Sequence, residues 1–240
     1  MTQLIADLGS SHGNDFDKAR ALVHQAIDYG ADVVKIYGPS AFTQAQWGML
    51  AGTCHVADTG FTVSAYDPET VKALESAVTL WRVPSGQVTN LPLLRALHTS
   101  KKPILLSRGL CTAWEYSMAL TWCAGAIGIR TVKEYPTDPH HYCRPAFAHM
   151  NGKYGLSDHS GEVWPSIGAA FGGAAYVEVH VRDEDAGTDV DGSVTWAQLH
   201  QLHTALAYIG QMSEDIWAGQ TDFRLKNARE KHMFREGDSS

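Results

Sequence analysis

The sequence predicts a single α/β domain, a closed (β/α)8 (TIM) barrel, and two features support this prediction. Short apolar runs typical of strands alternate with helical stretches along the chain, which is the order expected of a parallel sheet. The chain has 240 residues, a length at which a barrel of roughly 250 residues is an ordinary solution. Eight strand-helix units at this spacing favour a closed barrel over an open doubly wound sheet.

Each expected strand is a short run rich in β-branched or other apolar residues. These runs are 4–8, 32–37, 61–66, 80–83, 103–106, 126–132, 155–159 and 175–181. Apolar residues at helical spacing predict helices at 19–30, 68–74, 90–97, 112–123, 163–171 and 196–209. Residues 39–59 have the pattern of a less regular insertion. The barrel is expected to occupy residues 1–221, and residues 222–240 form a polar C-terminal tail with little apolar periodicity.

Composition excludes several classes of protein. The net charge of −7 and the absence of a basic run make a nucleic-acid surface unexpected. The four cysteines form no CxxC pair, so a reduced, cytoplasmic protein is expected. The N-terminus has no basic leader, and no apolar run is long enough to span a bilayer, so neither a targeting signal nor a membrane partner is expected.

Two strand ends carry a histidine each. Gly155-Leu156-Ser157-Asp158-His159 and Val177-Glu178-Val179-His180 are short apolar runs that end in an imidazole. If these strands are neighbours, His159 and His180 project into the same end of the barrel, where they can hold a divalent metal, with Asp189 a few residues later. The alternative is that each histidine only satisfies a hydrogen bond at a strand end.

The other strand ends favour an anionic small molecule. Lys35 and Arg82 lie within strand runs, where an unpaired charge is costly and should meet an anion or a carboxylate. Cations and hydroxyl groups outnumber carboxylates at these ends, which suits a phosphorylated or carboxylated ligand. The set comprises Asp7, His12, Lys35, Ser64, Arg82, Ser85, Ser107, Arg108, Lys133, Tyr135, Ser157, His159, His180 and Asp189. The serines are equally compatible with ordinary caps of β–α loops.

Other motifs are missing or weak. The glycines are scattered, which gives no support for a nucleotide-binding fingerprint. No serine lies in a GxSxG nucleophile elbow. His140 and His141, in the long loop after residue 132, form either a second metal site or, as the more ordinary interpretation, a solvated loop.

The chain resembles the sialic acid synthases, which condense phosphoenolpyruvate with an N-acylated amino sugar to make nine-carbon ulosonic acids. The resemblance covers roughly residues 3–212, and the order and spacing of its motifs make it specific. The motifs are Ala6-Asp7-Leu8-Gly9-Ser10-Ser11-His12, Asp32-Val33-Val34-Lys35, the run 83–94 from Val83-Pro84-Ser85-Gly86-Gln87 to Leu94, Lys102-Pro103-Ile104-Leu105-Leu106-Ser107-Arg108-Gly109, Tyr135-Pro136-Thr137, Gly155-Leu156-Ser157-Asp158-His159 and Glu178-Val179-His180.

The resemblance implies roles for individual residues. His159 and His180 would bind a divalent metal, usually Mn²⁺ with Mg²⁺ or Co²⁺ as alternatives, that activates the sugar aldehyde as a Lewis acid. Tyr135 and Asp189 would contact the acceptor sugar. Residues on the phosphoenolpyruvate side would be Lys35, Ser64, Arg82, Ser85, Ser107, Lys133 and Ser157.

The sequence departs from the family pattern at several of these positions. Gln87 replaces a glutamate that handles the attacking water, and an amide cannot accept that proton. Asp7 replaces a glutamate and Arg82 a lysine. Tyr37 stands in place of a glutamine, and Lys133 in place of an asparagine. The C-terminal antifreeze-like domain of the family is expected to be missing.

The expected function is a metal-assisted condensation of phosphoenolpyruvate with an aldehydo sugar, giving a 2-keto-3-deoxy sugar acid and phosphate. The expected partners are these two small molecules, and a homodimer is open as an oligomeric state. Two alternatives remain. One is a catalytically silent barrel that keeps phosphate and metal binding, and the other is a metal-independent aldolase that uses Lys35 as a Schiff-base lysine.

Overall fold

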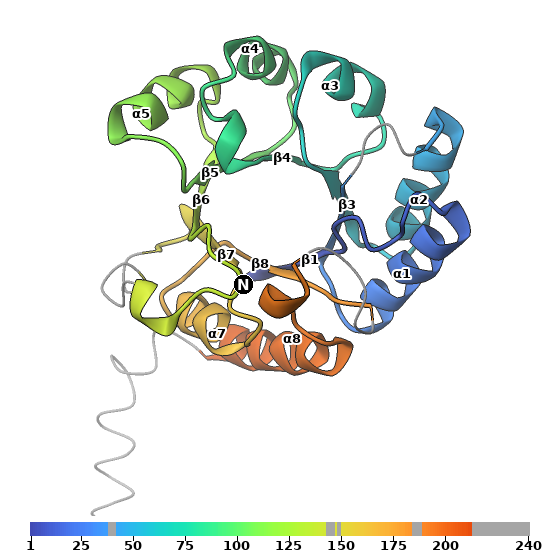
Figure 1. The fold of residues 1–240 in the computed structure, drawn as a ribbon, viewed down its shortest axis with the longest axis vertical. Helices are drawn as coiled ribbons and strands as arrows, with labels where there is room; N and C mark the ends of the chain where they lie inside the picture. The colour runs from blue at the N-terminus through green and yellow to red at the C-terminus, as the bar shows by residue number, and fades with distance from the viewer. Residues whose placement is uncertain (38–41, 143–146, 148–149, 184–188, 213–240) are drawn as a thin grey trace, which may run out of the picture. The chain divides into compact units, whose positions relative to one another are not determined.

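A computed structural model describes residues 1–37, 42–142, 147, 150–183 and 189–212. Eight parallel strands form one sheet in the order β3-β2-β1-β8-β7-β6-β5-β4, with helices outside it (Figure 1). The predicted (β/α)8 barrel is confirmed. The strands are β1 Gln3–Asp7, β2 Val33–Ile36, β3 Gly60–Val63, β4 Trp81–Val83, β5 Ile104–Arg108, β6 Ile127–Thr131, β7 Tyr154–Asp158 and β8 Tyr176–His180.

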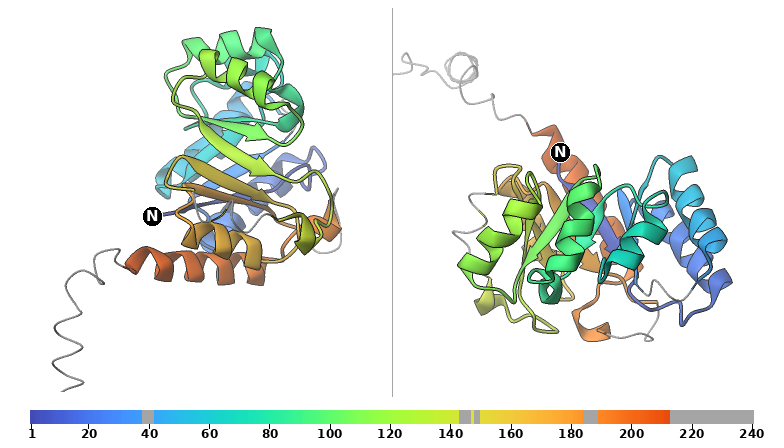
Figure 2. Two further views of the ribbon diagram at one scale, coloured as in Figure 1. Left: turned by 90° about the vertical axis from the view of Figure 1, so that its left-hand side faces the viewer. Right: turned by 90° about the horizontal axis from the view of Figure 1, so that it is seen from above.

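The helices surround the strands, as the side and top views show (Figure 2). The α-helices are α1 Phe16–Asp28, α2 Gln44–Val56, α3 Pro68–Leu74, α4 Leu91–Thr99, α5 Ala113–Trp122, α7 Trp164–Phe171 and α8 Trp196–Gln211, and the short 3-10 helices are η1 Ser85–Gln87, η2 Pro139–His141 and η3 Val190–Gly192. In the described ranges, no helix has the length and apolar character needed to cross a bilayer. The predicted boundary at residue 221 and the tail 222–240 lie outside the described residues.

The expectation of an irregular insertion at 39–59 is wrong, because most of this stretch is helix α2. Thr43 caps the helix: its hydroxyl accepts a hydrogen bond from the backbone of Gln46, whose side chain in turn accepts one from the Thr43 backbone. Trp47, Leu50 and Cys54 are buried at helical spacing against the barrel. Apolar and small residues on the other faces hide this spacing in the sequence.

We expect Thr43→Ala to lower the free energy of unfolding by about 1 kcal/mol, because the first turn of α2 loses its capping acceptor. Urea unfolding followed by circular dichroism measures the change. The control is Thr53→Ala in the same helix, whose hydroxyl only bonds back to the Met49 carbonyl and should be dispensable. Equal unfolding midpoints for the two variants would show that the cap contributes nothing.

The barrel closes where β3 meets β4, and the pairing between these two strands is short. The ladder there is a single bridge between Ser64 and Arg82, supported by a hydrogen bond from the Ala65 amide to the Arg82 carbonyl. Each of the other neighbouring strand pairs shares three or more register pairs. The sheet is therefore continuous, with its weakest joint at β3/β4.

Alternation along the strands separates an apolar floor from a polar end. One buried cluster inside the barrel contains Ile5, Val33, Leu80, Leu105 and Ile129. Because side chains alternate between the two faces of a strand, the residue two positions later points the same way. Those later residues are the polar Asp7, Lys35, Arg82, Ser107 and Thr131. The carboxyl end of the barrel is thereby lined with polar groups above an apolar layer.

Candidate active site

A pocket of about 290 Å³ lies at the carboxyl ends of the strands. The structure brings nearly all of the sequence-predicted site residues together in its lining. These are Asp7, Lys35, Ser64, Arg82, Ser85, Ser107, Lys133, Tyr135, Ser157, His159, His180 and Asp189. The carboxyl face is where barrel enzymes place their active sites, so this pocket is the candidate active site.

Four charged residues form a buried network at the base of the pocket. The Lys35 ammonium lies 2.6 Å from Asp7 Oδ2 and 3.4 Å from Glu178 Oε1. The Arg82 guanidinium donates two hydrogen bonds to the Glu178 carboxylate, from Nε to Oε2 at 2.7 Å and from Nη2 to Oε1 at 3.1 Å. The strand-interior cations therefore meet carboxylates, as the cost of an unpaired buried charge requires.

This pairing keeps both carboxyls ionised. Burial opposes the charged form of Glu178, but the positive charges of Arg82 and Lys35 outweigh it and hold the pKa of Glu178 well below its ordinary value. In the same way, Lys35 lowers the pKa of Asp7 against the effect of burial. The base of the pocket thus contains two cations and two anions, whose charges balance.

Glu178 is a site residue that the sequence interpretation missed. The residue is 2% exposed, and its side chain also accepts a hydrogen bond from the Ser157 hydroxyl at 2.8 Å. Glu178 lies two positions before His180 on β8, so both face the barrel interior. A charged residue inside an apolar strand run was the available signal, and it is the one that identifies Lys35 and Arg82.

Gln87 is absent from the described lining of the pocket. It lies in η1, and its side-chain carbonyl accepts a hydrogen bond from the Asn90 amide at 2.8 Å. Asn90 is itself the N-cap of α4. Gln87 is thus connected to the start of a helix, and its predicted catalytic position stays a prediction.

The two histidines lie side by side on β7 and β8, with ring centroids 5.3 Å apart. His159 Nδ1 is 2.8 Å from the Val132 carbonyl, which can only accept a hydrogen bond, so Nδ1 carries the proton. Its Nε2 is then the unprotonated nitrogen, and the hydroxyls of Ser157 and Tyr135 lie 3.1 Å and 3.2 Å from it. Burial, with the neighbouring His180, lowers the pKa of His159 to about 3. This neutral imidazole has the form that binds metals.

His180 has a carboxylate behind its ring, because its Nδ1 lies 3.5 Å from Asp7 Oδ2. Such an outer partner orients histidines that ligate metals. Within the described residues, no group of three His, Cys, Asp or Glu side chains is placed to hold a metal. The described residues thus bring together two imidazoles, the side-chain type that most often ligates metals in proteins.

A loop that contains Lys133 and Tyr135 lines the pocket beside the two histidines. The Tyr135 ring stacks on His159 at 4.2 Å, and its hydroxyl lies 3.2 Å from His159 Nε2. Burial, followed by the charges of Lys35 and Arg82, lowers the pKa of Lys133. Asp189, in a left-handed backbone conformation with φ of 68°, closes this side of the pocket.

The Thr131 hydroxyl is a further group that the sequence interpretation missed. It is buried without a hydrogen-bond partner in the described structure, and Thr131 lines the pocket. A buried polar atom normally has a partner. Its position is the inward one on β6, and its register partner on β7 is Ser157, which also lines the pocket.

His140 and His141 lie outside this pocket and are exposed. His141 Nδ1 pairs with Glu134 Oε2 at 2.5 Å, which links η2 to the loop that contains Lys133 and Tyr135. The described residues around this pair hold no metal-binding group of three. The ordinary interpretation of this loop fits the structure better than a second metal site.

We expect the imidazole of His141 to titrate above 6.5, because Glu134 accepts its hydrogen bond and attracts its charge. A pKa raised by folding means that the stabilisation is complete below the unfolded pKa and is lost as the pH rises through the folded pKa. NMR titration measures the midpoint. Glu134→Gln should return it toward 6.5, and an unchanged midpoint in that variant would contradict the pairing.

Comparison with known proteins places most of the barrel in one family of sequences. The model of the NeuB family matches residues 16–216. An N,N'-diacetyllegionaminic acid synthase of Campylobacter jejuni is 26% identical over 263 residues, which cover 89% of this chain and 78% of that protein. A pseudaminic acid synthase of Helicobacter pylori is 24% identical, and the match covers 74% of this chain and 65% of that protein. The chain thus spans just under two thirds of this second relative.

Solved structures share the fold. The N-acetylneuraminic acid (sialic acid) synthetase of Leptospira borgpetersenii, in complex with citrate, has a TM-score of 0.82 and 21% identity, covering 97% of this chain and 93% of that one. A truncated 3-deoxy-D-arabino-heptulosonate 7-phosphate synthase of Thermotoga maritima has a TM-score of 0.69 and 16% identity, covering 87% and 86%. At these identities the likeness shows the architecture.

Proposed function

Because the chain belongs to the NeuB family, we propose that it condenses phosphoenolpyruvate with an aldehydo sugar, with the help of a divalent metal, to give a 2-keto-3-deoxy sugar acid and phosphate. One observation supports this more than any other. Two adjacent imidazoles and a set of hydroxyls and cations line the same pocket of about 290 Å³. That arrangement suits a carbonyl on one side and a phosphorylated carboxylate on the other.

The phosphoenolpyruvate side begins with Lys133. Within the described part of the chain, Lys133 forms no ion pair with a carboxylate, whereas Lys35 and Arg82 are both paired. An entering anion therefore finds a cation at Lys133 and hydroxyl donors around it, which include Thr131. Lys35 and Arg82 lie below, where Asp7 and Glu178 neutralise them and hold their N–H groups in position.

His159 and His180 would hold the metal, for which Mn²⁺ is expected and Mg²⁺ or Co²⁺ are alternatives. Bound there, it would polarise the aldehyde carbonyl as a Lewis acid. The Val132 carbonyl and the Asp7 carboxylate orient the two rings. The Tyr135 hydroxyl, close to His159 Nε2, is placed to donate a hydrogen bond to the sugar.

In the proposed reaction, the methylene carbon of phosphoenolpyruvate forms a bond to the aldehyde carbon, whose oxygen takes up a proton. Water then adds to the former enol carbon and gives up one proton. The carbon-oxygen bond to phosphate breaks as the new hydroxyl becomes the keto group, and its proton goes to the departing phosphate. Lys133 and the serine hydroxyls would stabilise the leaving phosphate. Gln87 cannot accept the proton of the water. Of the carboxylates that line the pocket, Asp7 and Glu178 are ion-paired, whereas Asp189 has no described ion pair. Asp189 is therefore the carboxylate that we propose accepts this proton.

Gln87 favours a second candidate, a catalytically silent barrel that binds the same ligands. The aldolase alternative has weaker support, because a Schiff-base lysine must be deprotonated, and Lys35 lies between two carboxylates. Borohydride trapping of substrate on Lys35, insensitive to a chelator, would favour the aldolase. The expected homodimer and cytoplasmic location stay predictions. The free thiols of Cys54, Cys111 and Cys123 support a reducing compartment.

The test is release of inorganic phosphate from phosphoenolpyruvate with Mn²⁺ and a panel of aldehydo sugars that includes N-acetylmannosamine. We expect release only with a suitable acceptor, and its loss in Lys133→Gln. Lys153→Gln, an exposed lysine just before β7, is the control. Metal binding without release for any acceptor would favour the silent barrel and contradict the proposed reaction.

A further inference from the structure

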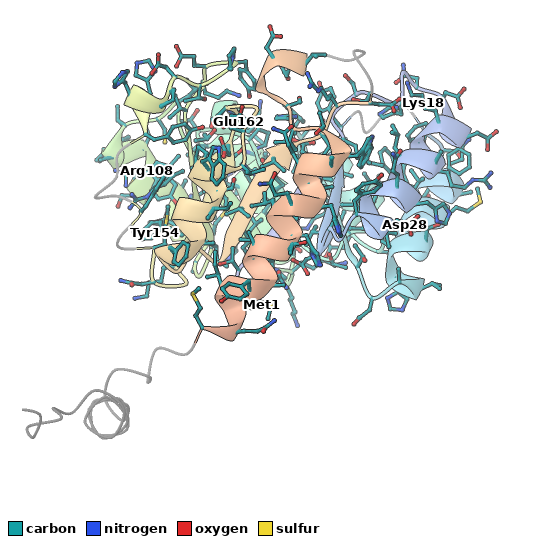
Figure 3. All side chains as sticks on the ribbon, turned by 90° about the horizontal axis from the view of Figure 1, so that it is seen from below. Met1, Lys18, Asp28, Arg108, Tyr154 and Glu162 are labelled. Atoms are coloured by element: carbon teal, nitrogen blue, oxygen red, sulfur yellow. The ribbon has the colours of Figure 1, made fainter. Side chains whose placement is uncertain are left out.

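Two tyrosines form one side of the candidate active site. Tyr37 directly follows β2 and Tyr66 follows β3, and both line the pocket. Their ring centroids lie 5.5 Å apart with an angle of 73° between the planes, which is an edge-to-face pair. They belong to the carboxyl end of the barrel, the side on which Lys18 and Glu162 are labelled in the view with all side chains, away from Met1 (Figure 3).

A side chain from another loop holds the backbone of each tyrosine. His12 Nδ1 accepts a hydrogen bond from the Asn14 amide at 2.9 Å, so its Nε2 carries the proton and donates to the Tyr37 carbonyl at 3.0 Å. Asn90 Nδ2 donates to the Tyr66 carbonyl, also at 3.0 Å. His12 is 1% exposed and is absent from the described lining of the pocket. This sequence-predicted site residue therefore acts from behind Tyr37, and the backbone of both tyrosines is fixed.

The position of the pair points to the acceptor. In the sheet order, β2 lies four places from β6, the strand that leads to Lys133, so Tyr37 lies across the barrel from the proposed phosphate side. Only β1 separates β2 from β8, which ends at His180. Gly9 follows β1 and lines the pocket: its carbonyl accepts a hydrogen bond from the Tyr37 amide at 3.0 Å, and a Cβ atom there would lie 3.9 Å from His180 Nδ1. Since glycine places no side chain between them, a ligand held at the histidines can extend to the tyrosines.

The two rings give this side of the pocket a neutral surface. Burial, followed by the neighbouring Tyr37 and Asp7, raises the pKa of Tyr66 to about 12, so its hydroxyl keeps its proton at pH 7. The face of an aromatic ring is electron-rich, and the C–H groups of a sugar carry partial positive charge because oxygen atoms are attached to the same carbons. A phosphate group placed here finds no unpaired cation on the described strands β2 to β4, because Lys35 and Arg82 both pair with carboxylates.

We propose that Tyr37 and Tyr66 form a tyrosine wall that selects a neutral, unphosphorylated sugar as the acceptor, by contact with its carbon-hydrogen face. This inference rests on the proposed function, which it extends from the aldehyde group to the remainder of the acceptor. The aldehyde end lies at the histidines, and the chain of hydroxylated carbons passes Gly9 and reaches the two rings. Neither ring takes part in a proton transfer. The wall acts on the affinity for the acceptor and on the choice among acceptors.

The test is a titration of the whole protein with two probes, N-acetylmannosamine and N-acetylmannosamine 6-phosphate, in the presence of Mn²⁺. Isothermal titration calorimetry gives the dissociation constants without any turnover. We expect the unphosphorylated sugar to bind several-fold more tightly than its 6-phosphate. Tyr66→Leu should weaken the binding of N-acetylmannosamine several-fold, and Tyr66→Phe, which keeps the ring, should recover most of that loss. Tyr208→Leu, at a tyrosine of α8 that is 65% exposed, is the matched control.

Two further measurements separate the tyrosine wall from general damage to the pocket. The dissociation constant of phosphoenolpyruvate should be the same in Tyr66→Leu as in the unmodified chain. Asn90→Ser keeps a good N-cap for α4 but loses the donor to the Tyr66 carbonyl, so it should weaken sugar binding without changing the urea midpoint.

Equal or tighter binding of the 6-phosphate would overturn the tyrosine wall, as would unchanged sugar affinity in Tyr66→Leu or an equal loss of phosphoenolpyruvate affinity in that variant. The absence of binding for both sugars would overturn it as well. Failure of the proposed function has a different result: the two sugars keep the expected order and the dependence on Tyr66, but phosphoenolpyruvate releases no phosphate.

Discussion

Replacing Glu178 by glutamine is expected to lower the free energy of unfolding by about 3–5 kcal/mol, because it leaves the buried Arg82 without its counter-charge and Lys35 with Asp7 as its remaining carboxylate partner. Glu178 is 2% exposed and contacts both Arg82 and Lys35. Repulsion between these cations, which Glu178 screens at present, would add to the loss. Equilibrium unfolding in urea at pH 7 measures the effect through the midpoint and the extrapolated free energy.

The matched control is Glu134→Gln, which removes a carboxylate from an exposed ion pair and should leave the urea midpoint unchanged. A double variant, Glu178→Gln with Arg82→Met, should regain part of the lost stability, because the stranded charge is removed together with its partner. If Glu178→Gln unfolds at the same urea concentration as Glu134→Gln, the network does not hold the barrel together.

Alanine at His159 or His180 is expected to lower the affinity for Mn²⁺ by more than about 100-fold, since even outer partners of metal ligands cost 10–100-fold when they are replaced. Each variant removes one of the two imidazoles that the described part of the chain places side by side in the pocket. Metal content after dialysis, measured by mass spectrometry, gives the result directly. Phosphate release from phosphoenolpyruvate should fall with it, and removal of metal from the unmodified chain by a chelator should have the same effect.

His24→Ala, at an exposed position on α1, is the control for this pair. It should bind metal as the unmodified chain does. Circular dichroism and thermal unfolding establish that the site variants remain folded. Unchanged metal content in both His159→Ala and His180→Ala would contradict the assignment of the metal to these two histidines.

Period-two alternation made most of the candidate site predictable. Lys35 and Arg82 stand out because a charge inside an apolar strand run must have a partner, and the structure supplies Asp7 and Glu178. The resemblance to sialic acid synthases, recognised from the order of the motifs, is confirmed by the match to the NeuB family. The fold followed from the same alternation of strands and helices, since parallel strands place every carboxyl end at one face.

What the sequence did not reveal depends on contacts between distant segments. In the sequence, Glu178 belongs to an ordinary strand motif. Its role becomes visible only in the structure, where Arg82, 96 residues earlier in the chain, donates a hydrogen bond to it. Gln87 occupies a motif position, yet its hydrogen bond to Asn90 serves the start of α4. Helix α2 was missed because its apolar residues are not confined to one face, although its capping pair Thr43 and Gln46 was a local signal.

The single bridge between β3 and β4 links ligand binding to the closure of the sheet. Ser64 borders that joint on one side, and Ser85 follows β4 on the other, and both line the pocket. A substrate that accepts hydrogen bonds from both hydroxyls would act as a removable cross-link across the joint. Amide hydrogens of β3 and β4 should then exchange with deuterium faster than those of β1 and β8 in the free protein, and slow most when substrate binds. Hydrogen exchange at this short β3/β4 ladder would therefore report whether substrate is bound in the pocket.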